Sequence, residues 1–206
     1  GKSEQPRAER TTSSGNGSLL LPAGEEDFRD MRQDLLIQST VRNDIQVFRF
    51  NEDGAAFGKG GASIVQVLLV DQNEAPLNWA VGGEVATLRI VCKAHQELYS
   101  PIIGFHLKDR LGQCLFGDNT FLAFMDSPLS VRSGQYIKAS FTFRIPVLAA
   151  GDYSFAVAIA EGTQADHVQH QWRHDALFLT SVATSASAGI MGIPMKEITL
   201  ESGDAE

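Results

Sequence analysis

The feature that most constrains this chain is a regular alternation of apolar and polar side chains along short segments. In residues 101–110 the apolar side chains are Ile103, Phe105 and Leu107, with small or polar side chains between them. Successive side chains of a strand point to opposite faces, so a period of two predicts strands with one buried face and one outward face. The same pattern recurs at residues 45–50, 62–70, 84–95, 113–116, 136–145, 152–161 and 174–182.

Turn-forming residues separate these segments, with Gly or Asp clusters at residues 81–83, 109–112, 133–134 and 150–152. No helical period lies between the segments, and short strands joined in this way are typical of antiparallel sheets. We therefore expect an all-β protein built as a β-sandwich of two packed sheets. A chain of 206 residues suits one such domain with additional segments at its ends.

The two ends of the chain differ from the expected sandwich at residues 55–200. Residues 1–24 are rich in Ser and Gly and lack periodicity, which predicts a flexible linker, and residues 201–206 form a tail. Between residues 25 and 37, Phe28, Met31 and Leu35 have helical spacing, and the first turn is acidic. This apolar stripe needs a surface to cover. Residues 25–54 are thus expected to be a helix-and-strand lead-in that covers this chain's own sheet or forms a dimer element with a second copy.

Composition excludes several classes of protein. With 43% hydrophobic residues the chain has enough apolar material for a core, and no apolar run approaches the roughly 20 residues of a membrane helix. A formal charge of −8 argues against nucleic acid as a partner. Its two cysteines are too few for a disulfide scaffold, and Cys92 alternates in phase with Leu88 and Ile90, which predicts a buried, reduced thiol.

One outward strand face is unusual because it carries no bulk. Ser154, Ala156 and Ala158 occupy positions where a solvated face normally carries long polar side chains. Other outward side chains would flank this small-residue floor if their strands are neighbours: Phe178, His106 and Lys108. The result would be a shallow trough in which an aromatic ring stacks on a sugar and polar groups bond its hydroxyls. The alternative is that the helix at 25–37 or a neighbouring subunit covers this face.

Further polar and aromatic side chains are expected beside the trough. Residues 116–120 indicate a turn that presents the amide of Asn119 and the hydroxyl of Thr120, although local turn chemistry also favours these residue types. Trp172 belongs to the expected site as well and lies in a segment, 162–175, that indicates a loop.

The sequence offers little support for catalysis, metal binding or nucleotide binding, and no cofactor is expected. Residues 54–60 resemble a phosphate-binding loop only superficially, because the glycine spacing is short by one and Gly60 replaces the metal-binding hydroxyl. The histidines at 167, 170 and 174 lack an accompanying acidic motif, so a polar loop is favoured over a metal site. Carboxylates fall in turns or at strand ends, where a sandwich places solvated charge.

Several motifs, in their order and spacing, resemble one known family. They are Gly82-Gly83-Glu84, the run GFHLKD at 104–109 followed by Gly112, FGDNT at 116–120, AGDYSF at 150–155 and WRHDAL at 172–177. Over residues 58–200 the chain resembles the carboxy-terminal domain of Wzt-type ATP-binding subunits of ABC transporters that export O-antigen polysaccharide. It departs from the family pattern at Asp118, where a small or hydroxyl residue is common.

The resemblance implies an immunoglobulin-like sandwich that binds lipid-linked O-antigen polysaccharide without chemistry of its own, during lipopolysaccharide biosynthesis. It implies a location in the cytoplasm, at the inner face of the bacterial inner membrane. The implied partners are a second copy in a homodimer, the ATPase domain and the membrane subunit of the transporter. Two other hypotheses remain open: a dimerisation or structural module without a glycan site, and an enzyme acting on glycans.

Overall fold

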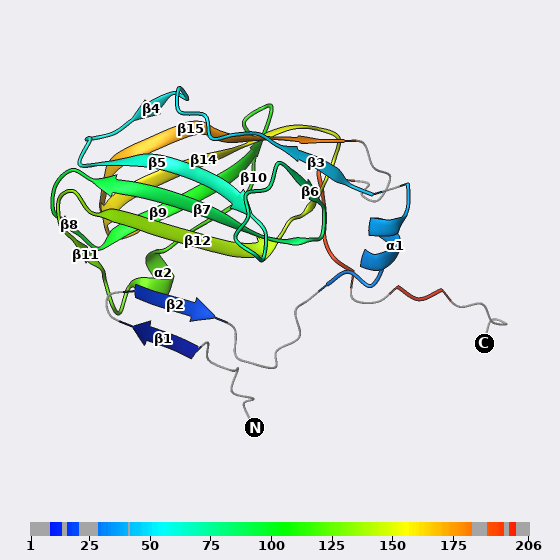
Figure 1. Ribbon diagram of the computed structural model, residues 1–206, viewed down its shortest axis with the longest axis horizontal. Coiled ribbons are helices and arrows are strands. Elements are labelled where there is room, and N and C mark those ends of the chain that lie inside the picture. The colour runs from blue at the N-terminus through cyan, green and yellow to red at the C-terminus, as the bar shows by residue number, and fades with distance from the viewer. Residues whose placement is uncertain are drawn as a thin grey trace.

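The computed structural model describes residues 9–13, 16–20, 29–40, 42–182, 189–195 and 198–200, which form mainly antiparallel sheets. The larger sheet has seven strands, in the order β10 (Cys114–Asn119), β9 (Pro101–Asp109), β14 (Gly151–Gly162), β15 (His167–Ser181), β3 (Asp44–Val47) and β6 (Trp79–Val81), with β4 (Ala56–Phe57) also paired to β15. The smaller sheet has the order β12 (Tyr136–Arg144), β7 (Val85–Ala94) and β5 (Ala62–Val70). The two sheets overlap in the view of Figure 1, which confirms the expected all-β sandwich.

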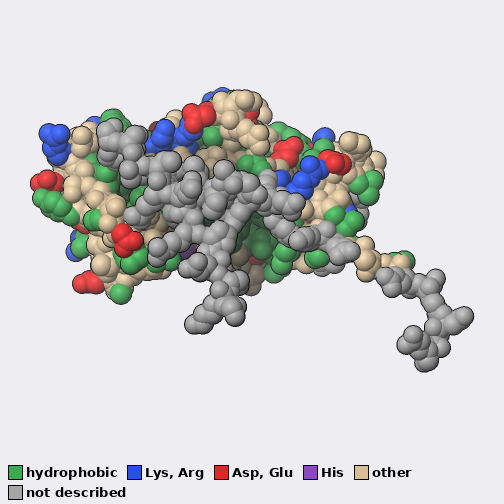
Figure 2. Space-filling view, turned by 90° about the horizontal axis from the view of Figure 1, so that it is seen from below, with side chains coloured by type: hydrophobic (Ala, Val, Ile, Leu, Met, Phe, Trp, Pro, Cys, Tyr) green, Lys and Arg blue, Asp and Glu red, His purple; other side chains and the backbone are tan. Residues whose placement is uncertain are grey.

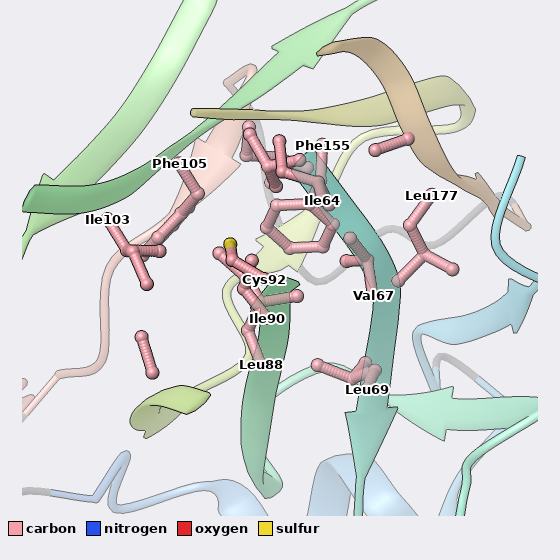
Figure 3. Close-up of a cluster of buried hydrophobic side chains, with 14 of the residues drawn as sticks. Ile64, Val67, Leu69, Leu88, Ile90, Cys92, Ile103, Phe105, Phe155 and Leu177 are labelled. Atoms are coloured by element: carbon pink, nitrogen blue, oxygen red, sulfur yellow. The ribbon is translucent and has the colours of Figure 1, made fainter. Parts of the chain in front are cut away.

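Apolar side chains from the inner faces of both sheets form one core (Figure 3). Phe105 packs against four other phenylalanine rings of this core, among them Phe155 at a ring-centroid distance of 5.7 Å and Phe141 at 5.0 Å, both edge to face. Such pairs are worth about 0.5–1.5 kcal/mol beyond the area they bury. Strand β7 follows the predicted alternation along its whole length, and Cys92 is fully buried in it. Burial raises the pKa of the Cys92 thiol to about 12, so the predicted buried, reduced thiol is confirmed as an unreactive core residue.

Smaller elements complete the described part of the chain. They are α1 (Gln33–Gln38), α2 (Phe121–Phe124), the pair β8 (Leu98–Tyr99) and β11 (Ser130–Val131), the pair β13 (Val147–Leu148) and β16 (Met191–Gly192), and the hairpin β1 (Glu9–Ser13) and β2 (Asn16–Leu20). The hairpin falls within residues 1–24, where a flexible linker is expected; the rest of that segment and residues 201–206 lie outside the described residues. Neither described helix has the length and apolar character needed to cross a bilayer.

Two segments that the sequence indicated as loop or turn are strands. Residues 167–175 belong to β15, which pairs with β14 in a long hairpin, so the predicted loop at 162–175 is wrong from residue 167 onwards and holds only for residues 163–166. The pattern failed because polar side chains also face inward there: the buried His170 imidazole lies 3.0 Å from a Glu161 carboxylate oxygen, and Gln171 accepts a hydrogen bond from the backbone N–H of Ile64. Likewise the predicted turn at 116–120 is wrong as far as Asn119, because β10 extends to that residue.

Helix α1 is shorter than the predicted helix at 25–37, whose first four residues lie outside the described part. Asp30 turns the chain before the helix begins: its carboxylate accepts the backbone N–H of Arg32, and its carbonyl accepts that of Gln33. The expected apolar stripe is uncovered, since Met31 is 54% exposed and Leu35 is 67% exposed. Helix α1 instead buries Gln33 against the backbone of Gly83.

The glycine pair at 82–83 has a packing role. A Cβ at Gly82 would lie 2.5 Å from the side-chain oxygen of Asn43, and one at Gly83 would lie 2.1 Å from that of Gln33. Gly83 also has a φ of +93°, which side-chain-bearing residues rarely adopt. Both amides are buried, and the Asn43 amide bonds the backbone of Leu148. The glycine pair therefore leaves room for the two buried amides of Gln33 and Asn43, which connect the N-terminal lead-in to the sandwich.

The segments before and after the sandwich are joined by Asp30. Its buried carboxylate accepts two hydrogen bonds from the Arg32 guanidinium, both 3.0 Å, and one of 2.9 Å from the backbone N–H of Met195. The Met31 N–H donates in turn to the Met195 carbonyl. Hydrogen bonding by Arg32 is the main reason that the pKa of Asp30 is lowered to about 2.

Candidate functional site

The outer face of the larger sheet carries a cross-strand row that contains two very small residues. By register, Asn119 on β10 lies opposite Gly104 on β9, Gly104 opposite Ala158 on β14, and Ala158 opposite Trp172 on β15. Directly opposed side chains on one face have Cβ atoms about 4.5–5.5 Å apart. A glycine and an alanine between an amide and an indole therefore leave a hollow.

The hollow is a pocket of about 310 Å³. Its lining combines small, aromatic and amide side chains: Ile102, Gly104, His106, Gly117, Asp118, Asn119, Ala156, Ala158, Ala160, Gln164, His167, Gln169 and Trp172, with Phe105. Five of the residues expected from the sequence are thus brought together here, namely His106, Asn119, Ala156, Ala158 and Trp172. Of the expected small-residue floor, Ala156 and Ala158 line this pocket and Ser154 does not.

Two glycines allow the pocket to form. A Cβ on Gly104 would lie 2.9 Å from the Cβ of Asn119, and a Cβ on Gly117 would lie 2.3 Å from the ring of His106. Real Cβ atoms do not come this close to other heavy atoms, so a side chain at either position would push β10 or His106 away. These glycines belong to the GFHLKD and FGDNT motifs, and packing explains their presence.

His106 and Trp172 form the aromatic part of the lining. Their ring centroids are 5.4 Å apart and their ring planes are inclined by 63°; His106 lies opposite Ala156 of the floor. The ammonium of Lys108 lies 5.5 Å from the Trp172 ring centroid, within the range of a cation–π contact. Desolvation, and to a lesser degree the charge of Lys108, lower the pKa of His106. Both effects favour the neutral imidazole, which offers one donor and one acceptor nitrogen.

Four expected site residues lie outside the pocket lining. The Lys108 ammonium contacts the Trp172 ring. Ser154, which lies opposite Lys108, donates a 2.6 Å hydrogen bond to the Asp175 carboxylate. The Thr120 hydroxyl accepts the backbone N–H of Ile103 at 3.1 Å, so it fastens β9 to the start of α2. Phe178 is opposite Ser154 on the outer face and is 39% exposed, but it does not line the pocket.

Sequence reasoning missed the residues that come from the wrongly predicted loop and from β4. Gln169 and His167 line the pocket because β15 extends to residue 167. Phe57, on β4, lies opposite Trp172, with the two rings stacked at 6.4 Å. The signal available for Phe57 was an aromatic residue within the glycine-rich run at 54–61, where glycines by themselves indicate a flexible segment.

A second hollow, of about 430 Å³, lies between α1 and the segments 71–77 and 83–85. The charged side chains that face it are already engaged. Arg29 and Asp34 form an ion pair of 2.5 Å, and Arg144 donates to the Gly83 carbonyl at 2.8 Å. We therefore regard the pocket on the outer face of the larger sheet as the stronger candidate.

The described residues show no grouping suited to metal binding. His170 is committed to Glu161, while His174 packs against the rings of Phe57 and Trp172 at centroid distances of 5.9 and 6.0 Å. The carboxylate of Asp118 accepts the N–H of Asn119 at 2.7 Å. In the face drawn in Figure 2, acidic and basic side chains are interspersed rather than gathered into one patch. Among the side chains that line the pocket, only Asp118 is a carboxylate and none is Lys or Arg, so most of its polar groups are hydrogen-bonding groups of Asn, Gln, His and Trp side chains.

Comparison with known proteins places the chain in a family. A family model described as the Wzt C-terminal domain matches residues 53–193, which is more than half of the chain. The chain belongs to the Wzt C-terminal domain family. Membership implies a role in an O-antigen ABC transporter, and the Wzt C-terminal domain is non-catalytic, with the ATPase domain separate from it.

A solved structure from this family agrees on the fold. A crystal structure of the C-terminal domain of Wzt is similar with a TM-score of 0.62 and 19% sequence identity, over 73% of this chain and 91% of that one. A β-glucuronidase from glycoside hydrolase family 2 reaches a TM-score of 0.29 and 14% identity, over 53% of this chain and 11% of that one. None of the curated proteins matches this chain in sequence. The Wzt-like fold agrees with the sandwich expected from the sequence.

Proposed function

We propose that this Wzt C-terminal domain recognises lipid-linked O-antigen polysaccharide, without catalysis, before an ABC transporter exports it. The observation that carries the proposal is the row in which Gly104 and Ala158 lie between the amide of Asn119 and the indole of Trp172. Such a hollow admits a sugar ring between a hydrogen-bonding wall and an aromatic wall.

The chemistry of the lining supports binding through hydroxyl groups. Each sugar hydroxyl both donates and accepts a hydrogen bond, and so do the amides of Asn119 and Gln164 and the neutral imidazole of His106. The apolar face of a sugar ring would contact the floor at Ala158 and the edge of Trp172. Binding of this kind depends weakly on salt, because it does not rest on exposed ion pairs.

Titration with polysaccharide tests the proposal directly. The chain has two tryptophans, Trp79 and Trp172, so the variant Trp79→Phe leaves the pocket indole as the only one. Its fluorescence is followed while O-polysaccharide, released from the lipopolysaccharide of the organism that encodes the chain, is added. We expect a saturable change with this polysaccharide and none with dextran. Equal responses to both, or no response, would contradict recognition and favour a structural or dimerisation module without a glycan site.

The transporter context supplies the proposed partners and location. We assign the domain to the cytoplasmic side of the bacterial inner membrane, where it works with the ATPase domain and the membrane subunit. The support for this assignment is the family match over residues 53–193.

We further propose that two copies associate through α1 and the segment 193–195. The backbone N–H of Met31 donates to the carbonyl of Met195, which brings α1 beside this segment, and apolar side chains there are exposed: Met31, Leu35, Ile193 and Met195. An uncovered apolar surface of this kind marks an interaction site. Light scattering after gel filtration should give a dimer for the wild type and a monomer for Leu35→Glu. The matched variant Leu111→Glu, at an exposed turn far along the chain, should remain dimeric.

A further inference from the structure

The glycine-rich run before β5 is an ordered strand that adds one ring to the outer face. Strand β4 pairs with β15, and backbone hydrogen bonds of 2.9 Å continue on both sides of it: the Lys59 N–H donates to Gln169, and the His174 N–H donates to Ala55. Through this pairing Phe57 joins the same cross-strand row as Asn119, Gly104, Ala158 and Trp172.

Close contact of the backbones explains the glycines around Phe57. A Cβ at Gly58 would lie 2.2 Å from the His170 carbonyl oxygen, and Gly58 has a φ of +145°. A Cβ at Gly61 would lie 2.5 Å from the His170 ring. Larger residues would lift β4 away from β15, so the run holds Phe57 in a defined position rather than leaving it mobile.

The two flanks of Trp172 are not equivalent. Strands β9 and β4 lie on opposite sides of β15, so Lys108 and His106 approach the indole from the pocket side and Phe57 approaches it from the other. The Phe57 and Trp172 rings are inclined by only 19°, which stacks one face of Phe57 on the indole. Phe57 is nevertheless 59% exposed, so its aromatic surface remains available beyond the pocket wall.

We infer that Phe57 is a second stacking position for the polysaccharide, one that takes a sugar residue adjoining the residue held in the pocket. The inference rests on the proposed function. Two observations support it: Phe57 continues the row that forms the pocket, and its ring stays 59% exposed while it stacks on Trp172. The site would then bind a segment of the polymer rather than a single sugar.

Chain length is the variable that tests this inference. The released O-polysaccharide is partially hydrolysed and separated by size, and each fraction is titrated against the wild type, Phe57→Ala and Phe57→Tyr in the Trp79→Phe background. In the wild type we expect affinity to rise from the shortest binding fragment to the next larger ones. Phe57→Ala should bind the larger fragments roughly three- to tenfold more weakly than the wild type and the shortest fragment equally well. Phe57→Tyr should keep the increase of affinity with fragment length.

Tyr136→Ala is the matched control, because it removes an exposed ring from the smaller sheet. It should bind all fragments like the wild type. If Phe57→Ala loses the same affinity for short and long fragments, Phe57 acts only by positioning Trp172. If it binds long fragments as the wild type does, Phe57 does not contact the polysaccharide. Either result overturns the inference but leaves the proposed function standing. Absence of binding by the wild type overturns both.

Discussion

The outer faces of the two sheets belong to one sandwich but are built in different ways. On the smaller sheet, the outward positions of β7 and β12 carry side chains that pair across the strands. The hydroxyls of Thr87 and Thr142 are 2.8 Å apart, and the Lys93 ammonium lies 5.7 Å from the ring centroid of Tyr136. On the larger sheet, Gly104 and Ala158 occupy neighbouring outward positions and leave a hollow between larger side chains.

The difference shows that alternation alone does not distinguish a solvated face from a binding face. Strand β7 of the smaller sheet and strand β9 of the larger one both alternate with a period of two and bury one face. What distinguishes the outer faces is which side chains stand opposite one another. Small residues that lie opposite one another leave a pocket. Polar or charged residues that contact one another across the strands fill the space between them.

Filling the hollow is the most severe test of the comparison. We expect Ala158→Leu to reduce polysaccharide binding at least about tenfold, because the added side chain occupies the pocket floor. Ser140→Leu places the same side chain on the outer face of β12 and should leave binding unchanged. Fluorescence titration measures both. Similar binding by the two leucine variants would remove the distinction between the two faces.

Removing the indole should affect stability as well as binding. Trp172 is only partly buried, but it contacts the rings of Phe57, His106 and His174. We expect Trp172→Ala to lower the free energy of unfolding by about 2 kcal/mol, measured by urea denaturation. Tyr136→Ala, on the other sheet, should cost less than about 1 kcal/mol because that ring is more exposed. Equal costs would mean that the aromatic cluster adds no stability.

The pH dependence of stability should reveal His106. Its pKa is lowered in the folded protein, mainly by desolvation and further by Lys108, so the unfolded chain binds a proton more readily. Stability contributed by the neutral ring is present above the ordinary histidine pKa of 6.5 and falls as pH drops below it. The wild type should therefore lose more stability between pH 7 and pH 5 than His106→Gln does. An equal loss in both proteins, measured by urea denaturation at each pH, would show that His106 titrates normally.

The smallest effect is expected on the outer face of the smaller sheet. Thr142→Ala removes the cross-strand hydroxyl pair with Thr87 and should lower the free energy of unfolding by about 0.5 kcal/mol. A double-mutant cycle with Thr87→Ala isolates this pair. No change in polysaccharide binding is expected from any member of the cycle, and a change would show that the smaller sheet contributes to the site.

Period-two alternation predicted most of the fold because each strand of the core is amphipathic. Strands β5, β7, β9, β12 and β14 lie within about one residue of the predicted segments. The start of β15 was missed because His170 and Gln171 put polar groups at buried or half-buried positions, where the His170 ring lies beside Glu161 of β14 and Gln171 accepts a hydrogen bond from Ile64 of β5. Periodicity cannot represent partners that are distant in sequence.

The same limit applies to the site. The lack of bulk at Ala156 and Ala158 was visible in the sequence, and the structure places His106, Asn119 and Trp172 around it. The opposition of Gly104 and Ala158 depends on strand register between β9 and β14, which no local pattern specifies. Phe57 was overlooked because glycines normally indicate flexibility, whereas here they permit close backbone approach.

The carboxylate of Asp30 has one more consequence. Because its pKa is lowered to about 2, the carboxylate keeps its negative charge through the neutral pH range, and with it the hydrogen bonds to Arg32 and Met195. A change of pH near neutrality is therefore not expected to separate residue 30 from residue 195, two positions far apart in the sequence that meet outside the pocket lining.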